Sequence, residues 1–178
     1  MSEDEDQNLM QRVRQSDTVA MRRLYERYHD PLMAFLIGRG ADLTTAPDVL
    51  QDTMLEVWRS ADRFRGASSF KTWVFAIARN KLIDRQRKQS KMYDLVDVPE
   101  IADDALNPEA AAVASSDEKR VRRCLEGLKP AHLTAIRLAF YEDLNYAEIA
   151  SIESVPVGTI KTRVHHAKRL LMRCLGHR

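Results

Sequence analysis

The 178-residue sequence has no apolar run long enough to span a bilayer, which takes roughly 18 to 20 residues. Its longest apolar stretch, LMAFLI at residues 32–37, is far too short. The first residues, MSEDEDQ, are acidic, whereas an export signal begins with basic residues and continues with apolar ones. We therefore expect a cytoplasmic protein that does not insert into a membrane.

Cysteine is scarce, because only Cys124 and Cys174 occur, far apart and in no CxxC motif. The favoured interpretation is two reduced thiols that pack in the interior, and a regulatory disulfide is the alternative. The five histidines are scattered, and Cys174 with His177 is the one pair that suggests zinc. No cluster of nucleophiles, acids or metal ligands indicates an enzyme, and we predict no cofactor.

Charge of one sign is missing from long stretches. Residues 71–91 hold seven cations and one acid, residues 92–118 hold eight acids and no cation, and residues 159–178 hold six Lys or Arg and no acid. Two basic blocks around an acidic one predict two polyanion-binding modules on a tether. The prolines and acids of residues 92–113, which show no sustained periodicity, predict a flexible linker.

Strand-like alternation is also absent, whereas helical spacing recurs along nearly the whole chain. We expect a first long helix with an apolar stripe from Val19 to Leu36 and an end at the GRG of residues 38–40. A second helix has Thr45 as its expected N-cap, and a third is capped by Ser68 or Ser69. Its inner stripe is Phe70, Trp73, Val74, Ile77 and Ala78. About four helices follow residue 116, so the predicted fold is all-α, with two small helical domains.

The second helix has two different faces. The expected buried face is Leu50, Met54, Val57, Trp58 and Ala61. The remaining side chains, which point outward, are Asp48, Gln51, Asp52, Leu55 and Glu56.

The stretch VPVGTIKTRVHHAKRLL at residues 155–171 predicts the second helix of a helix-turn-helix. Asn145 and Glu148 cap the preceding helix, and Pro156 begins the next one. Helical spacing places Val157, Ile160, Val164, Ala167 and Leu171 toward the core. The opposite face carries small groups and hydrogen-bond donors suited to a DNA major groove, namely Gly158, Thr159, Lys161, Thr162, Arg163, His165, His166 and Arg169.

Two segments together resemble a known family. DVLQDTMLEVWRSADRFRGASSFKTWVFAIARNKLIDRQRK resembles region 2 of bacterial sigma factors, and LEGLKPAHLTAIRLAFYEDLNYAEIASIESVPVGTIKTRVHHAKRLL resembles region 4. With no other sigma regions present, the chain is similar to the extracytoplasmic-function (ECF) sigma factors. The resemblance implies an acidic segment at 1–17, region 2 at 18–91, a linker at 92–116 and region 4 at 117–178.

The resemblance also implies roles for residues. It places core RNA polymerase on the outward face of the second helix, at Asp48, Gln51, Asp52 and Leu55. It places near the bases of the minus-ten promoter element Arg79, Asn80 and Asp84, and near its phosphate backbone Lys81, Arg85, Arg87 and Lys88. Aromatic partners for unstacked bases are available at Phe70, Trp73 and Phe75, with core packing favoured for Trp73.

The same resemblance implies that the exposed residues of the last helix bind the minus-thirty-five element, and that an anti-sigma protein inhibits the chain. Two departures from the family pattern affect this helix-turn-helix. Glu153 and Ser154 stand where Leu-Gly is usual, which puts the turn geometry in question, and His166 stands where Arg is common. The alternative to a sigma factor is a helix-turn-helix regulator that binds duplex DNA without polymerase.

Overall fold

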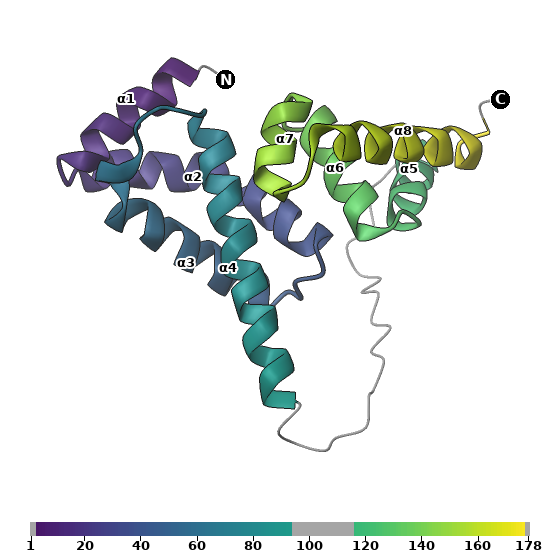
Figure 1. The fold of residues 1–178 in the computed structure, drawn as a ribbon, viewed down its shortest axis with the longest axis horizontal. Coiled ribbons are helices and arrows are strands. Elements are labelled where there is room, and N and C mark those ends of the chain that lie inside the picture. The colour runs from purple at the N-terminus through teal and green to yellow at the C-terminus, as the bar shows by residue number, and fades with distance from the viewer. Residues whose placement is uncertain (1–2, 94–115, 177–178) are drawn as a thin grey trace.

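The computed structural model describes residues 3–93 and 116–176, so most of the predicted linker and His177 lie outside the described residues. Within those ranges every regular element is helical, and the all-α prediction is confirmed. Figure 1 shows α1 to α4 on one side of the molecule and α5 to α8 on the other. The elements are α1 (Glu3–Arg14), α2 (Thr18–Gly38), α3 (Thr45–Arg59), the 3₁₀ turn η1 (Ala61–Arg63), α4 (Phe70–Tyr93), α5 (Ser116–Glu126), α6 (Pro130–Phe140), α7 (Tyr146–Glu153) and α8 (Val157–Cys174).

The N-terminal domain is built around α2, whose apolar stripe is buried from Ala20 to Leu36. Val19, which we expected in that stripe, is 57% exposed, so this prediction is wrong. It lies in the first helical turn, where no neighbouring helix covers it.

The acidic N-terminal segment is a helix, α1, that packs on α2 through Leu9, Met10 and Val13. At the other end of α1, Asp6 is buried and accepts hydrogen bonds from Arg27 and Tyr28. Burial and the carboxylate raise the pKa of the Tyr28 phenol. The segment at 1–17, which we expected to be separate from region 2, thus packs on the helix α2.

Asp42, and not Thr45, caps the start of α3. The Asp42 Oδ1 atom accepts from the backbone N–H groups of Thr45 and Thr44 at 2.5 and 3.0 Å and from the Thr44 hydroxyl at 2.8 Å. Thr45 is the first helical residue and is buried. The predicted cap residue was therefore wrong, because the aspartate two residues before Thr44 offers a stronger, charged acceptor.

These hydrogen bonds, the one from the Thr45 backbone first, lower the pKa of Asp42 from 3.8 to about 2. Its stabilising contribution is complete above its ordinary pKa and is lost as the pH falls through about 2. We expect Asp42→Ala to lower the free energy of unfolding at neutral pH by about 1 kcal/mol in urea titrations. Asp42→Asn, which keeps an acceptor, is the control and should recover most of the loss. Equal losses in both variants would rule out the cap.

The C-terminal domain packs α8 against α6 and α7. The predicted cap of α7 is confirmed as a full capping box, because Asn145 accepts from the Glu148 N–H and the Glu148 carboxylate accepts from the Asn145 N–H. Ile160, Val164 and Ala167 of α8 are buried, as predicted. Val157 is 40% exposed, so its assignment to the core was wrong. It is the first residue of α8, three positions before the buried Ile160.

A disulfide joins Cys124 of α5 to Cys174 of α8. The prediction of two reduced packing thiols was therefore wrong. The two helices lie side by side, and their Cα atoms at these positions are 5.8 Å apart. The Cys174 sulfur is bonded to the Cys124 sulfur, which contradicts the suggested pairing of Cys174 with His177 around zinc.

The two domains touch each other along α4 and α7 and along α2 and α6. Three glutamates of the C-terminal domain make polar contacts to the other domain. Glu142 pairs with Lys71 at 3.1 Å, Glu148 accepts from the hydroxyls of Ser69 and Thr72, and Glu153 pairs with Arg39 at 2.5 Å. These contacts hold the two domains together in the structure.

Within residues 3–93 and 116–176, no helix has the length and apolar character that crossing a membrane requires.

Candidate nucleic-acid and protein interfaces

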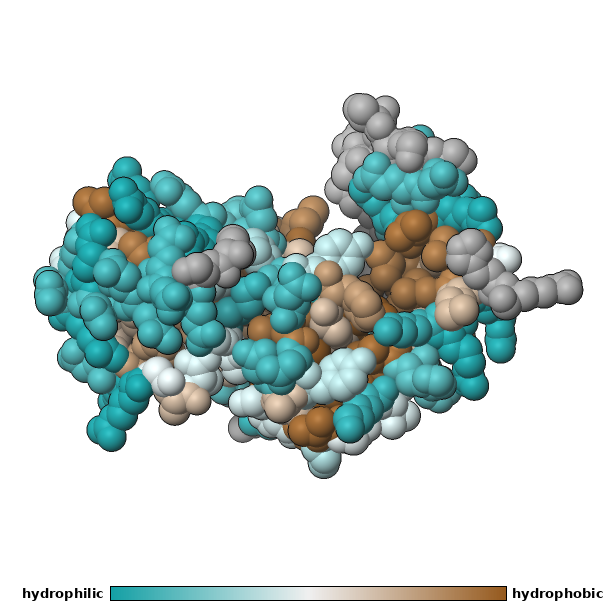
Figure 2. All heavy atoms as spheres, turned by 90° about the horizontal axis from the view of Figure 1, so that it is seen from above, coloured by the Kyte–Doolittle hydropathy of each residue, from teal (hydrophilic) through white to brown (hydrophobic). Residues whose placement is uncertain are grey.

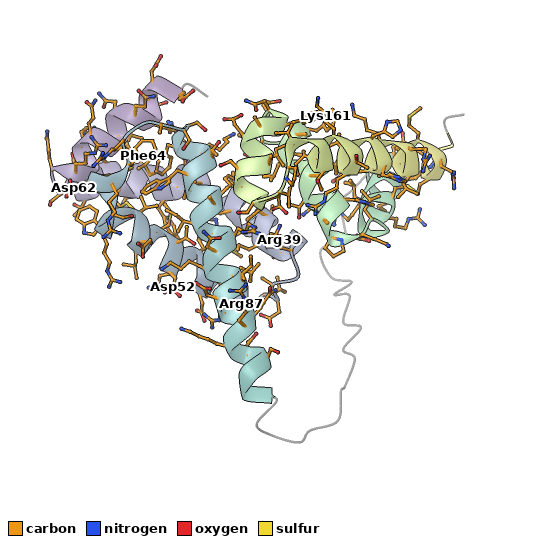
Figure 3. The ribbon with its side chains drawn as sticks, viewed as in Figure 1. Arg39, Asp52, Asp62, Phe64, Arg87 and Lys161 are labelled. Atoms are coloured by element: carbon orange, nitrogen blue, oxygen red, sulfur yellow. A yellow bond between two sulfur atoms is a disulfide. The ribbon has the colours of Figure 1, made fainter. Side chains whose placement is uncertain are left out.

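The residues predicted to form a docking face on α3 lie on the surface of the protein. Asp48, Gln51, Asp52 and Leu55 are all exposed, opposite the buried side that contains Leu50 and Val57. Leu55 is 43% exposed and lies among acidic side chains. Figure 3 shows Asp52 on α3, with Arg87 on the neighbouring α4. The structure therefore brings the four predicted residues together on one surface.

Two ion pairs join α3 to α4. Arg85 donates to Asp48 at 2.7 Å, and Lys81 donates to Glu56 at 3.0 Å. The hydrogen bond from Lys81 lowers the pKa of Glu56. Two cations of the predicted minus-ten set thus contact acids of the α3 surface, and the two predicted sites adjoin one another.

The predicted minus-ten residues lie along the middle and C-terminal part of α4. Asn80, Asp84, Arg87 and Lys88 are exposed, whereas Arg79, Lys81 and Arg85 are half-buried. The Arg79 guanidinium lies against the other domain, 3.4 Å from the Ser154 hydroxyl. In this closed arrangement the C-terminal domain covers part of the surface that the sequence analysis assigned to DNA.

The aromatic residues of α4 belong to the core. Phe70 and Phe75 are fully buried and make edge-to-face contacts with Tyr28 and Phe35, with ring centroids 5.1 Å apart in each pair. Trp73 is half-buried and packs beside Phe64, as the favoured interpretation predicted. The suggestion that Phe70 and Phe75 receive unstacked bases is wrong, because helical periodicity directs both rings inward.

The outer face of α8 carries the predicted donors. Gly158, Lys161, Thr162, His165 and Arg169 are exposed, and Figure 3 shows Lys161 on the outer edge of the helix. A Cβ atom added at Gly158 would meet no atom of the chain within 4 Å. Packing inside the protein therefore does not require glycine there.

The other three predicted residues of α8, Thr159, Arg163 and His166, are half-buried. The His166 ring stacks on His132 of α6, with centroids 5.8 Å apart and an angle of 9° between the planes. Burial, followed by the positive charges around it, lowers the pKa of His132. The sequence analysis did not find His132, which lies 34 positions from its partner in the sequence.

The turn between α7 and α8 keeps its helix-turn-helix geometry despite the unusual Glu153 and Ser154. Ser154 adopts φ 52°, and its N–H donates to the carbonyls of Ala150 and Ser151. The Glu153 side chain is only 5% exposed and contacts Arg39 at 2.5 Å and Arg163 at 3.5 Å. The buried Glu153 carboxylate is thus paired with two arginines.

A groove of about 820 Å³ lies between the domains, lined by residues of α2, α5 and α6. Its apolar lining includes Pro31 and Ile37 of α2 and Val121 and Leu125 of α5. Seen from above in Figure 2, hydrophobic side chains gather mainly over the C-terminal domain, while the N-terminal domain is largely hydrophilic on that face.

Each of the two domains matches a known protein family. Residues 24–92 match the Sigma-70 region 2 family, and residues 118–171 match the Sigma-70 region 4 family. The ECF RNA polymerase sigma-E factor of Haemophilus influenzae is 33% identical over 93% of each chain. The RNA polymerase sigma-H factor of Pseudomonas aeruginosa is 29% identical over 98% of this chain and 96% of its own.

Among solved structures, the fold is similar to that of the sigma factor RpoE in its complex with the anti-sigma factor NepR from Bartonella quintana. The TM-score is 0.70, the sequence identity is 29%, and the match covers 87% of this chain and 96% of that one.

Proposed function

Because the chain belongs to the ECF sigma factors of RNA polymerase, it is a promoter-specificity subunit, and we propose which of its surfaces perform each part of that task. The exposed face of α3, at Asp48, Gln51, Asp52 and Leu55, binds the core enzyme. The exposed cations of α4 bind the minus-ten element, and the outer face of α8 binds the minus-thirty-five element.

The observation that carries this proposal is the placement of one acidic and two basic exposed surfaces on one chain. The α3 surface is acidic with an exposed leucine, which suits a protein partner, whereas α4 and α8 expose Lys and Arg, which suit phosphates. A regulator that acts on duplex DNA alone has no use for the first surface. Catalysis of RNA synthesis then belongs to the polymerase, and this chain selects the start site in the cytoplasm.

An anti-sigma protein is the proposed inhibitor. The similar sigma factor from Bartonella quintana was solved with such a partner. The contacts between the two domains of this chain fit such control, because they place part of α4 under α7 even before a partner binds.

The test is transcription from a promoter library by core polymerase with and without this chain. We expect start sites only when both are present, downstream of a shared pair of sequence elements. Selection of the same sequences by the chain alone, with equal affinity, would favour the duplex-binding regulator.

The same library separates the roles of two exposed residues of α8. Lys161→Ala should change the preference at one or two base pairs upstream, at a cost of about 1–3 kcal/mol for those pairs. Arg169→Ala, as the phosphate-binding comparison, should weaken binding to all sequences and reduce the salt dependence. If Lys161→Ala leaves every base preference unchanged, Lys161 does not contact bases.

A further inference from the structure

The disulfide joins the first and the last helix of the C-terminal domain, and its two ends differ in exposure. Cys124 in α5 is 5% exposed, whereas Cys174, the last residue of α8, is exposed. These are the only two cysteines of the sequence, so neither has another cysteine of the chain to pair with.

The position of α5 depends strongly on this bond. From Asp117 to Glu126 only Cys124 is buried and Leu125 is half-buried, and α8 is the main packing partner of the helix. A hydrogen bond from the Arg120 guanidinium to the Leu175 carbonyl is a further contact to the end of α8. A helix of 11 residues with so little apolar contact is marginal in water by itself.

α5 also shapes the surface between the domains. Val121 and Leu125 contribute one wall of the groove of about 820 Å³, and Pro31 and Ile37 of α2 contribute the wall from the other domain. Movement of α5 therefore changes a surface that includes parts of both sigma regions.

We propose that Cys124 and Cys174 form a reversible thiol–disulfide switch that sets the position of α5, with a low-molecular-weight disulfide as the oxidant. Transcription takes place in a reducing compartment, where protein disulfides are rare and those that form are mostly transient or redox-sensing. This step rests on the proposed cytoplasmic function. The placement of the two sulfurs and the weak packing of α5 do not depend on it.

The exchange takes place in two steps. In the reduced protein, the exposed Cys174 thiolate attacks one sulfur of the small disulfide, forms a mixed disulfide and releases one small thiolate. The Cys124 thiolate then attacks the Cys174 sulfur and releases the second small thiolate. The protein loses two protons and two electrons, and the small disulfide becomes two thiols. Reduction follows the same path in reverse.

In the oxidised protein α5 is held on α8 and the groove keeps its wall. In the reduced protein α5 is left with few noncovalent contacts, among them those of Leu125 and Arg120, so α5 separates from α8 much of the time. The redox state of the cell thus sets whether the surface between the domains is complete.

The full-length protein is equilibrated in glutathione buffers of graded ratio, and its free thiols are counted after acid quenching. We expect the count to change from two to none within the range of ratios tested. In parallel, amide hydrogen exchange across α5 should become about tenfold faster or more in the reduced form, with little change in α2 and α3. Both measurements are made without polymerase or promoter, so they fail or succeed separately from the proposed function.

Cys174→Ser should exchange like the reduced wild type in every buffer. Met172→Ser, which removes another exposed sulfur-containing side chain two positions earlier on α8, should retain the wild-type response. A bond that persists in about a hundredfold excess of reduced glutathione is a permanent structural disulfide and overturns the switch. Thiols that never pair, or equal exchange of α5 in the two states of the wild-type chain, overturn it as well.

Discussion

Core RNA polymerase should no longer co-purify with the Asp52→Arg variant. Asp52 is exposed on the face of α3 proposed to bind the core enzyme, so a reversed charge places repulsion where attraction is expected. We expect binding to weaken by about 3 kcal/mol, or roughly a hundredfold in Kd, measured by fluorescence anisotropy of the labelled chain against core enzyme. The fold should be retained, because substitutions at exposed helix positions usually have small effects on stability.

Glu26→Arg is the matched control for this change. Glu26 is also an exposed acid on a helix of the N-terminal domain, but it lies on α2, outside the proposed docking face. Its affinity for core enzyme should stay close to that of the wild type. A folded Asp52→Arg chain that binds core enzyme as tightly as Glu26→Arg does would remove α3 from the proposed interface.

Neutralising Glu153 should open the contact between the two domains. Its buried carboxylate pairs with Arg39 at the end of α2 and with Arg163 on α8. Glu153→Gln leaves both guanidinium groups without their charged partner, and because the Arg39 and Arg163 side chains are only 18% and 23% exposed we expect a loss of about 2 kcal/mol. That loss shifts the balance toward separated domains by about thirtyfold. Small-angle scattering of the free chain should report a larger radius of gyration.

Arg39→Gln separates the two roles of Glu153. It removes only the partner on the other domain and leaves the Arg163 pair within the helix-turn-helix, so it should open the domains nearly as much as Glu153→Gln. Glu26→Gln, an exposed change on α2, should leave scattering unchanged. Scattering identical to the wild type in both Glu153→Gln and Arg39→Gln would show that this ion pair does not hold the domains together.

Much of the fold was predictable because it depends on local patterns. The buried stripe from Leu24 to Leu36 follows the helical period, and the box of Asn145 and Glu148 fixes the start of α7 within four residues of sequence. The same periodicity that made α4 recognisable also shows why Phe70 and Phe75 are buried. The exposed face of α3 could be predicted because its opposite face was already occupied by apolar residues.

The features that were missed depend on contacts between distant segments. Arg39 and Glu153 are 114 positions apart, and nothing local indicates that they meet. The disulfide likewise requires α5 to lie on the end of α8, which the spacing of two cysteines does not reveal. For α1 a local signal did exist, since Leu9, Met10 and Val13 share one helical face, but we expected only an acidic segment there.

The ion pair between Arg85 and Asp48 joins the surface proposed to bind the polymerase to the surface proposed to bind the minus-ten element, and it couples these two proposed contacts thermodynamically. In the proposed function, a DNA phosphate competes with Asp48 for the Arg85 guanidinium, and the polymerase competes with Arg85 for the Asp48 carboxylate. DNA that binds Arg85 therefore leaves Asp48 more available to the polymerase, and polymerase that binds Asp48 leaves Arg85 more available to DNA. This coupling must act equally in both directions. Since a solvent-exposed pair contributes at most about 1 kcal/mol, the mutual enhancement is up to about fivefold. This is enough to favour DNA binding by the polymerase-bound chain over the free one.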